Sequence, residues 1–195
     1  MFSPGLVETV ISIFNDIISA ESSSQKNKGD HFSSALTNAR IWNSLQKHAI
    51  ADSKTFAEYY SNPWLRLVCL SYLGPAYRIT AQVNVVRPGG RPQVSHRDYH
   101  LGFQPPERVI EYSTTAHAAS ALLTLQGAVA HGDMPLESGP TRLLPFSQHF
   151  PQGYLATSIE EFRTYFEKNY VSLPLSPGDG LFFNPALIHA AGQND

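Results

Sequence analysis

The sequence changes character at Gly74-Pro75, and this change constrains the fold more than any other feature. Before it, apolar residues recur at three- and four-residue spacings, which is typical of helices. After it, short apolar or alternating runs are separated by turns rich in proline and glycine, which is typical of strands. We therefore expect a single domain over 1–195, in which helices over 1–75 buttress a β-rich core over 76–195.

The first part contains several helix starts. Ser3-Pro4 predicts an N-cap followed by proline at the first helical position, with apolar residues at helical spacing up to Ile18. The polar run 21–30 predicts a loop. The pattern over 32–60 predicts one or two further helices, and Pro63 is expected to begin another that reaches about residue 73.

The second part predicts a mainly β fold with flanking helices. Its 77–86 and 94–103 runs resemble the two arms of a hairpin, and 122–129 is favoured as a strand although a buried helix fits its apolar residues as well. A capping box at Ser158 and Glu161 predicts a helix over 158–169. Further short strands are expected at 142–145, 171–175, 181–183 and 187–190.

Charge and cysteine content restrict the partners and the compartment. A formal net charge of −2 provides no basic field for nucleic acid or an anionic membrane, so we expect a small-molecule site. Cys69 is the only cysteine, which excludes an intramolecular disulfide. The N-terminal run contains Glu8 and Asp16 and no long uncharged span, so we expect an intracellular, cytoplasmic protein without a membrane span. The sequence leaves the oligomeric state open.

The segment 93–100 contains the main chemical signal. If it is a strand, residues two apart share a face, so His96, Asp98 and His100 point the same way. Two histidines and one carboxylate bind Fe(II) in many oxygenases and leave positions free for substrates. The candidate for the remaining ligand is His189, which lies on a short apolar run beside small residues.

Two other interpretations stay open on the residues alone. In the first, His96, Asp98 and His100 together bind Zn(II) for hydrolysis, although neighbouring positions on one strand face lie about 7 Å apart and would need a twist or a bulge to reach one ion. Alternatively, the histidines are structural and the domain is a non-catalytic jelly-roll binding module. No nucleophile elbow, phosphate loop or Cys-x-x-Cys pair supports another class.

Four segments, taken together, resemble the phytanoyl-CoA dioxygenase family of Fe(II)- and 2-oxoglutarate-dependent oxygenases. They are 82–89, 96–103, 138–145 and 177–189, and they follow one another in the family's order. The resemblance implies a double-stranded β-helix of jelly-roll, cupin-like type with the iron in the mouth of the barrel. It also implies hydroxylation or another oxidation of an organic small molecule by dioxygen, with succinate and CO2 as co-products.

The resemblance also implies roles for individual residues. His96, Asp98 and His189 match the iron ligands of the family, and iron with 2-oxoglutarate would be its cofactor and co-substrate. Related halogenases have a small residue in place of Asp98, so the aspartate implies a hydroxylase or a similar oxidase. The 2-oxoglutarate pocket is matched by a further set of polar residues, which are Asn84, Thr141 and Gln82.

Two departures from the family pattern stand out. The family turn Gly-Ser-His is replaced here by Phe146-Ser147-Gln148-His149. The family arginine that grips 2-oxoglutarate follows the second iron histidine by about a dozen residues, whereas this sequence ends six residues after His189. We therefore expect a fragment in which the β-helix is incomplete at its C-terminal end. Replacement of that arginine by Arg142 or Arg87 is the alternative.

Overall fold

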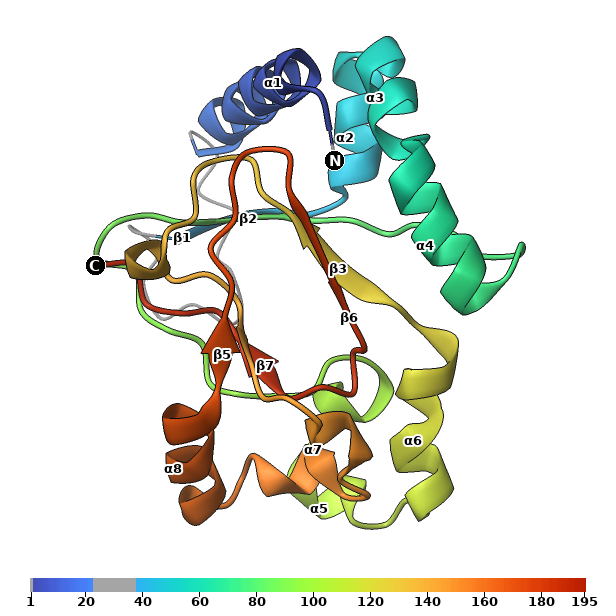
Figure 1. Ribbon diagram of the computed structural model, residues 1–195, viewed down its shortest axis with the longest axis vertical. Helices are drawn as coiled ribbons and strands as arrows, with labels where there is room; N and C mark the ends of the chain where they lie inside the picture. The colour runs from blue at the N-terminus through green and yellow to red at the C-terminus, as the bar shows by residue number, and fades with distance from the viewer. Residues whose placement is uncertain (1, 23–37) are drawn as a thin grey trace.

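The computed structural model describes residues 2–22 and 38–195. Figure 1 shows two groups of helices at opposite ends of the molecule, with the short strands between them. One group comes from the start of the chain, and the other comes from the segments between the later strands. The strands therefore hold the middle of the molecule.

Four helices form the first group, and local capping explains where they begin. Asp52 and Asn62 each accept hydrogen bonds from two backbone N–H groups of the helix that follows them. Proline occupies the first helical turn after Asn62, as predicted. The helices are α1 (Pro4–Ser22), α2 (Ser44–Ala51), α3 (Ser53–Tyr60) and α4 (Pro63–Leu73). Within the described ranges, no helix has both the length and the apolar character needed to cross a bilayer.

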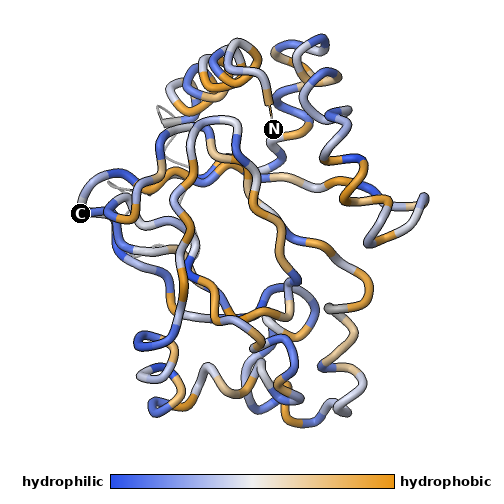
Figure 2. The backbone as a smooth tube through the Cα atoms, viewed as in Figure 1, coloured by the Kyte–Doolittle hydropathy of each residue, from blue (hydrophilic) through white to orange (hydrophobic). Residues whose placement is uncertain are grey.

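The largest apolar cluster joins the first helices to the strands. Figure 2 shows apolar and polar residues alternating along the turns of α1, as in a helix with one buried face. Val10 and Phe14 of α1 pack there with Tyr59 of α3 and with Ile41. Val129, from a strand far along the chain, packs against the same cluster. The N-terminal helices therefore pack against residues of the strand region.

The strands are short and pair only in antiparallel fashion. They are β1 (Asn38–Ile41), β2 (Val83–Val86), β3 (Gln126–Val129), β4 (Arg142–Leu143), β5 (Val171–Ser172), β6 (Gly180–Phe183) and β7 (His189–Ala190). β1 pairs with β2, β3 pairs with β6, and β4 lies between β5 and β7. In the described residues, β2 therefore pairs with β1 and not with the 94–103 segment expected as the second arm of its hairpin.

The prediction of a mainly β fold is not supported. No named strand in the described ranges exceeds four residues, whereas helices such as α6 (Thr114–Leu123) and α8 (Glu160–Asn169) run for ten. The shorter helices α5 (Pro106–Val109) and α7 (Gly153–Ala156) add to the second group. The apolar run that fitted either structure divides into helix α6 and strand β3. The alternation of apolar residues correctly indicates extended backbone in several places, but the hydrogen-bonded pairing of each described strand with its neighbour covers at most four residues.

The strand predicted over 94–103 is wrong. His96 makes one isolated antiparallel bridge with His189, and the chain then leaves extended geometry at Tyr99 (φ 63°) and His100 (φ 41°). A 3-10 helix, η1 (His100–Phe103), follows. Gly102 packs so closely on Arg97 that a Cβ atom would lie 2.3 Å from the Arg97 carbonyl oxygen. This contact, which no local pattern reveals, closes the turn.

Candidate metal centre

His96, Asp98 and His189 converge in the structure although they come from distant parts of the chain. His96 Nε2 lies 3.3 Å from Oδ1 of Asp98, and His189 Nε2 lies 3.3 Å from the other oxygen, Oδ2. One nitrogen or oxygen atom from each of the three residues lies within 4.8 Å of the others. His189 is 4% exposed. The three predicted residues therefore form a group that can hold a metal ion.

The backbone fixes which ring nitrogen of each histidine faces the centre. His96 Nδ1 lies 2.8 Å from the carbonyl oxygen of Val94, and His189 Nδ1 lies 2.8 Å from that of Leu187. A carbonyl only accepts hydrogen bonds, so each Nδ1 carries a proton and donates it. In a neutral ring the lone pair is then on Nε2, which is the atom that points at Asp98.

Opposite charges shift the protonation equilibria of this group. Burial alone raises the pKa of Asp98, but the hydrogen bonds and charges of His189 and His96 outweigh it and hold that pKa well below its usual range. Burial lowers the pKa of His96, and Asp98 outweighs this effect, so the pKa of His96 is raised. A metal ion on Nε2 of His96 would displace the proton that Asp98 favours there.

Two further side chains touch the group. Gln126 of β3 donates a hydrogen bond of 2.5 Å from Nε2 to Asp98 Oδ2, and its own buried Oε1 has no partner among the described residues. The ring of Phe183 on β6 meets the ring of His189 edge-on, with centroids 5.0 Å apart. Sequence reasoning missed Gln126, whose only signal is one amide inside the apolar run of 122–129.

His100 does not join the centre. Its backbone lies in the 3-10 helix after the turn at Tyr99, and it is absent from the group of potential ligands found in the described part of the chain. The expectation that His96, Asp98 and His100 share a strand face is therefore wrong for His100. The extended geometry needed for that face ends at Asp98.

The residues matched to the 2-oxoglutarate pocket lie in different settings. Asn84 is on β2 and accepts a hydrogen bond of 2.8 Å from Nε of Arg40, which is opposite it on β1 and only 5% exposed. The positive charge of Arg40 also makes a minor contribution that lowers the pKa of His96. Thr141 directly precedes β4, and Gln82 is exposed before β2. Their role as a co-substrate pocket stays a prediction.

Arg142 is already paired. Its Nη1 donates to both carboxylate oxygens of Glu167, at 2.9 and 2.8 Å, and its Nη2 donates to the carbonyl oxygen of Gln93. Its guanidinium also lies over the ring of Tyr170. These contacts argue against Arg142 as the arginine that binds 2-oxoglutarate. The other suggested arginine, Arg87, lies on the exposed turn after β2.

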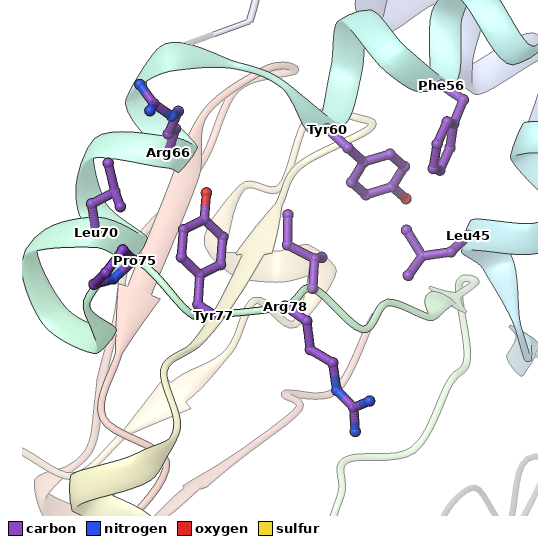
Figure 3. Close-up of a pocket in the computed structure, with 9 residues that line it drawn as sticks. Leu45, Phe56, Tyr60, Arg66, Leu70, Pro75, Tyr77 and Arg78 are labelled. Atoms are coloured by element: carbon purple, nitrogen blue, oxygen red, sulfur yellow. The ribbon is translucent and has the colours of Figure 1, made fainter.

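Two cavities of similar volume differ in their distance from the candidate ligands. One of about 490 Å³ borders His96 and Asp98 and is also lined by Arg97 and Tyr154. The other, of about 530 Å³, is shown in Figure 3 and lies between the first helices and the segment before β2. Its lining includes Tyr60 and Tyr77 and none of the three candidate ligands. Only the first cavity therefore touches the candidate centre.

Comparison with known proteins connects this geometry to a family. The model of the family described as phytanoyl-CoA dioxygenase (PhyH) matches residues 2–195. The chain is 26% identical over 150 residues to Dioxygenase andF from Emericella variicolor, and the alignment covers 73% of this chain and 46% of that protein. The chain therefore spans about half the length of the curated relative it matches.

Solved structures share the fold at low sequence identity. EctD from S. alaskensis, crystallised with 2-oxoglutarate and 5-hydroxyectoine, has a TM-score of 0.61 at 18% identity, covering 100% of this chain and 64% of its own. SnoN, a non-heme alpha ketoglutarate dependent epimerase from nogalamycin biosynthesis, has a TM-score of 0.56 at 17% identity, covering 96% and 67%. AviO1 from Streptomyces viridochromogenes Tue57 has a TM-score of 0.66 at 14% identity, covering 99% and 79%.

Proposed function

Because the chain belongs to the phytanoyl-CoA dioxygenase family, whose model matches residues 2–195, we propose that it is an Fe(II)- and 2-oxoglutarate-dependent dioxygenase. It hydroxylates or otherwise oxidises an organic small molecule, with succinate and CO2 as co-products. The convergence of His96, Asp98 and His189 carries this proposal. Two imidazoles and one carboxylate with open positions beside them form the ligand set of non-haem Fe(II) oxygenases.

The donor atoms fit one ion. Ligand atoms on one face of an octahedral ion, each about 2.1 Å from it, lie about 3 Å apart. His96 Nε2 lies 3.3 Å from Oδ1 of Asp98 and His189 Nε2 lies 3.3 Å from Oδ2, so each separation is close to this value. Because both Nδ1 atoms are engaged by backbone carbonyls, the Nε2 atoms of His96 and His189 are the ones that would hold the ion.

The residues of this chain hold the ion and balance its charge. One carboxylate and two neutral imidazoles offset one of the two positive charges of Fe(II) and leave three positions free. Bound there with 2-oxoglutarate, Fe(II) would supply the oxidation chemistry by which dioxygen oxidises the substrate. Asp98 raises the pKa of His96, and Nε2 of His96 must be unprotonated to bind iron, so iron binding is coupled to proton release there.

A nearby positive charge favours an anionic co-substrate. Arg40 is buried and hydrogen-bonded to Asn84, one of the residues matched to the 2-oxoglutarate pocket. Thr141 and Gln82 complete the proposed pocket. The solved structures of EctD with 2-oxoglutarate and of SnoN as an alpha ketoglutarate dependent enzyme support this choice of co-substrate.

The same proposal extends to the fold. Three small antiparallel sheets, with the sheet of β3 and β6 and the sheet of β4 and β7 both contributing residues to the centre, are consistent with parts of a double-stranded β-helix. Gln126 and Phe183 reach the centre from the first of these sheets, and His189 reaches it from the second. An ion between two sheets would have sheet-borne side chains on both sides, as in the mouth of a jelly roll.

Anaerobic titration of the purified chain with Fe(II) tests the proposal. We expect one ion to bind per chain, and the visible charge-transfer absorption of chelated Fe(II) to appear when 2-oxoglutarate is added. His96→Ala and Asp98→Ala should each weaken Fe(II) binding by more than about 100-fold, because ligand loss exceeds the 10- to 100-fold effect typical of residues that only support ligands. His149→Ala, which removes an exposed imidazole, serves as the matched control.

The alternatives predict other results. Wild-type Fe(II) affinity in both His96→Ala and Asp98→Ala would refute the ligand assignment. A chain that binds no metal would favour a non-catalytic binding module. Tight Zn(II) binding that survives loss of His189 and needs no 2-oxoglutarate would favour a hydrolase instead.

A further inference from the structure

Two separate chain segments supply the candidate ligands, so something must set the distance between them. His96 and Asp98 flank Arg97 on one segment, and His189 directly follows Ile188 on the other. The side chain of Arg97 and the backbone of Ile188 both contact one residue of a third segment. This residue is Ser147, which has no solvent exposure.

Ser147 is bonded to both segments. Its Oγ accepts a hydrogen bond of 2.7 Å from the N–H of Ile188 and donates one of 2.8 Å to the carbonyl oxygen of Leu144. Its own carbonyl oxygen accepts a hydrogen bond of 2.5 Å from Nη2 of Arg97. One buried residue therefore contacts the neighbours of all three candidate ligands.

The buried guanidinium of Arg97 is held by hydrogen bonds to backbone carbonyls. It is 2% exposed, and Nη2 also donates to the carbonyl oxygen of Phe150 at 2.9 Å. No carboxylate forms an ion pair with it among the described residues. Gly153 packs directly on its guanidinium, where a Cβ atom would lie 1.9 Å from the central carbon. The guanidinium is therefore held in one position by carbonyls and close packing.

Tyr154 links this guanidinium to Asp98. Its ring lies 5.6 Å from the guanidinium carbon of Arg97, and its hydroxyl donates a hydrogen bond of 3.1 Å to the backbone carbonyl of Asp98. The segment with His96 and Asp98 is thus held by Ser147 and Tyr154 through Arg97 and the backbone of Asp98. The side chains of His96 and Asp98 themselves contact His189.

We propose that Ser147 is a positioning residue that sets the spacing of the three metal ligands by binding Ile188 through its hydroxyl and Arg97 through its carbonyl. This inference rests on the proposed function, since it concerns the same centre. Loss of the hydroxyl frees the N–H of Ile188 and lets the strand with His189 move relative to Asp98. Ligand geometry held by surrounding hydrogen bonds is a main determinant of metal affinity.

Titration with Co(II), which substitutes for Fe(II) and has visible absorption bands sensitive to geometry, tests the inference. Ser147→Ala should raise the Kd for Co(II) by about 10- to 100-fold and alter the band shape. Ser138→Ala is the matched control, because the Ser138 hydroxyl also donates to the carbonyl three residues earlier, at 2.9 Å from Pro135, but makes no hydrogen bond to the ligands or their direct neighbours among the described residues. Val10→Ala controls for lost stability, since Val10 is a fully buried core residue of α1.

Arg97→Met gives a second route in case Ser147→Ala does not fold. It removes the bond to the Ser147 carbonyl but keeps an apolar stem of similar length, and it should also raise the Kd and change the bands. In the double variant, the loss of Co(II) binding free energy should be smaller than the sum of the losses in the two single variants, because both substitutions break the same linkage through Ser147. Wild-type Kd and band shape in either folded variant would overturn the inference. Absence of Co(II) and Fe(II) binding by the unaltered chain would instead refute the proposed function, and the inference with it.

Discussion

His96 and His189 exchange both backbone hydrogen bonds across a 93-residue separation. The N–H of His96 lies 2.9 Å from the carbonyl oxygen of His189, and the reverse bond is 3.0 Å. Their rings, with centroids 4.7 Å apart, therefore lie on the same side of the pair. A shift of one residue in this register would turn one ring to the opposite face. The relative position of the two histidines is set by the backbone rather than by a metal.

Replacing Gln126 should weaken metal binding without destroying the site. Its amide donates a hydrogen bond to Oδ2 of Asp98, so Gln126→Leu removes one of the contacts that orient the carboxylate. We expect Fe(II) affinity to fall by about 10-fold, at the lower end of the effect seen when supporting partners of metal ligands are lost. Anaerobic Fe(II) titration measures the change. Gln152→Leu, at an exposed glutamine, should leave the affinity unchanged, and equal affinities for all three proteins would contradict the prediction.

Phe146 occupies a backbone conformation that suits glycine. Its φ of 64° lies in the left-handed region, and its side chain is 77% exposed, so it gains little packing for the strain. Phe146→Gly should raise the free energy of unfolding by about 0.5–1 kcal/mol, since relief of strain is partly offset by the greater freedom of glycine in the unfolded chain. Urea unfolding measures this difference.

The control for this substitution is Phe150→Gly. Phe150 has φ −71°, and its ring packs on Phe162 with centroids 5.8 Å apart. Glycine there removes packing and relieves no strain, so stability should fall. A fall in stability in both variants would show that the left-handed turn at Phe146 is not strained.

Local signals located several helices, and the short strands β4, β5, β6 and β7 each overlap a predicted range. α1 and α4 begin at prolines that a local rule identifies, and α8 lies within two residues of the predicted range. The strand expected through His100 is broken by the left-handed turn at Tyr99, where Gly102 packs on the carbonyl oxygen of Arg97. The alternation of residues does not reveal this contact. For the same reason β1 was not predicted, because its four residues show no alternation without the pairing with β2.

The candidate site was more accessible from the sequence than the fold around it. Residue chemistry and two-residue spacing singled out His96 and Asp98, and extended backbone up to Asp98 keeps them on one face. His189 was singled out by its neighbouring small residues and by family resemblance. The structure places it beside His96 and Asp98, and its role as a ligand stays a prediction. Gln126 and Ser147 could not be found this way. Their importance comes from contacts with residues far away in sequence.

His48, which is buried on α2, and His131, which follows β3, both pack against aromatic rings of the first helices. Tyr59 Oη lies 2.8 Å from Nε2 of His131. Burial, together with the charge of His48, lowers the pKa of His131 to about 4. Burial also lowers the pKa of His48, against a smaller opposite effect of Asp52. Both rings are therefore neutral in the folded chain at pH values where an unfolded histidine, with a pKa of about 6.5, is protonated.

Stability should therefore fall on acidification. Between pH 7 and pH 5 the unfolded chain binds protons that the folded chain excludes, so the free energy of unfolding decreases by about 1–2 kcal/mol for His131 alone. This stability is fully present above pH 6.5 and is lost as the pH falls towards 4, the folded pKa of His131. Urea unfolding at several pH values measures the slope. His131→Gln keeps an acceptor for Tyr59 but cannot titrate, so its slope should be shallower, whereas His149→Gln, at an exposed histidine, should keep the wild-type slope. An unchanged slope in His131→Gln would mean that His131 takes up protons as readily in the folded chain as in the unfolded one.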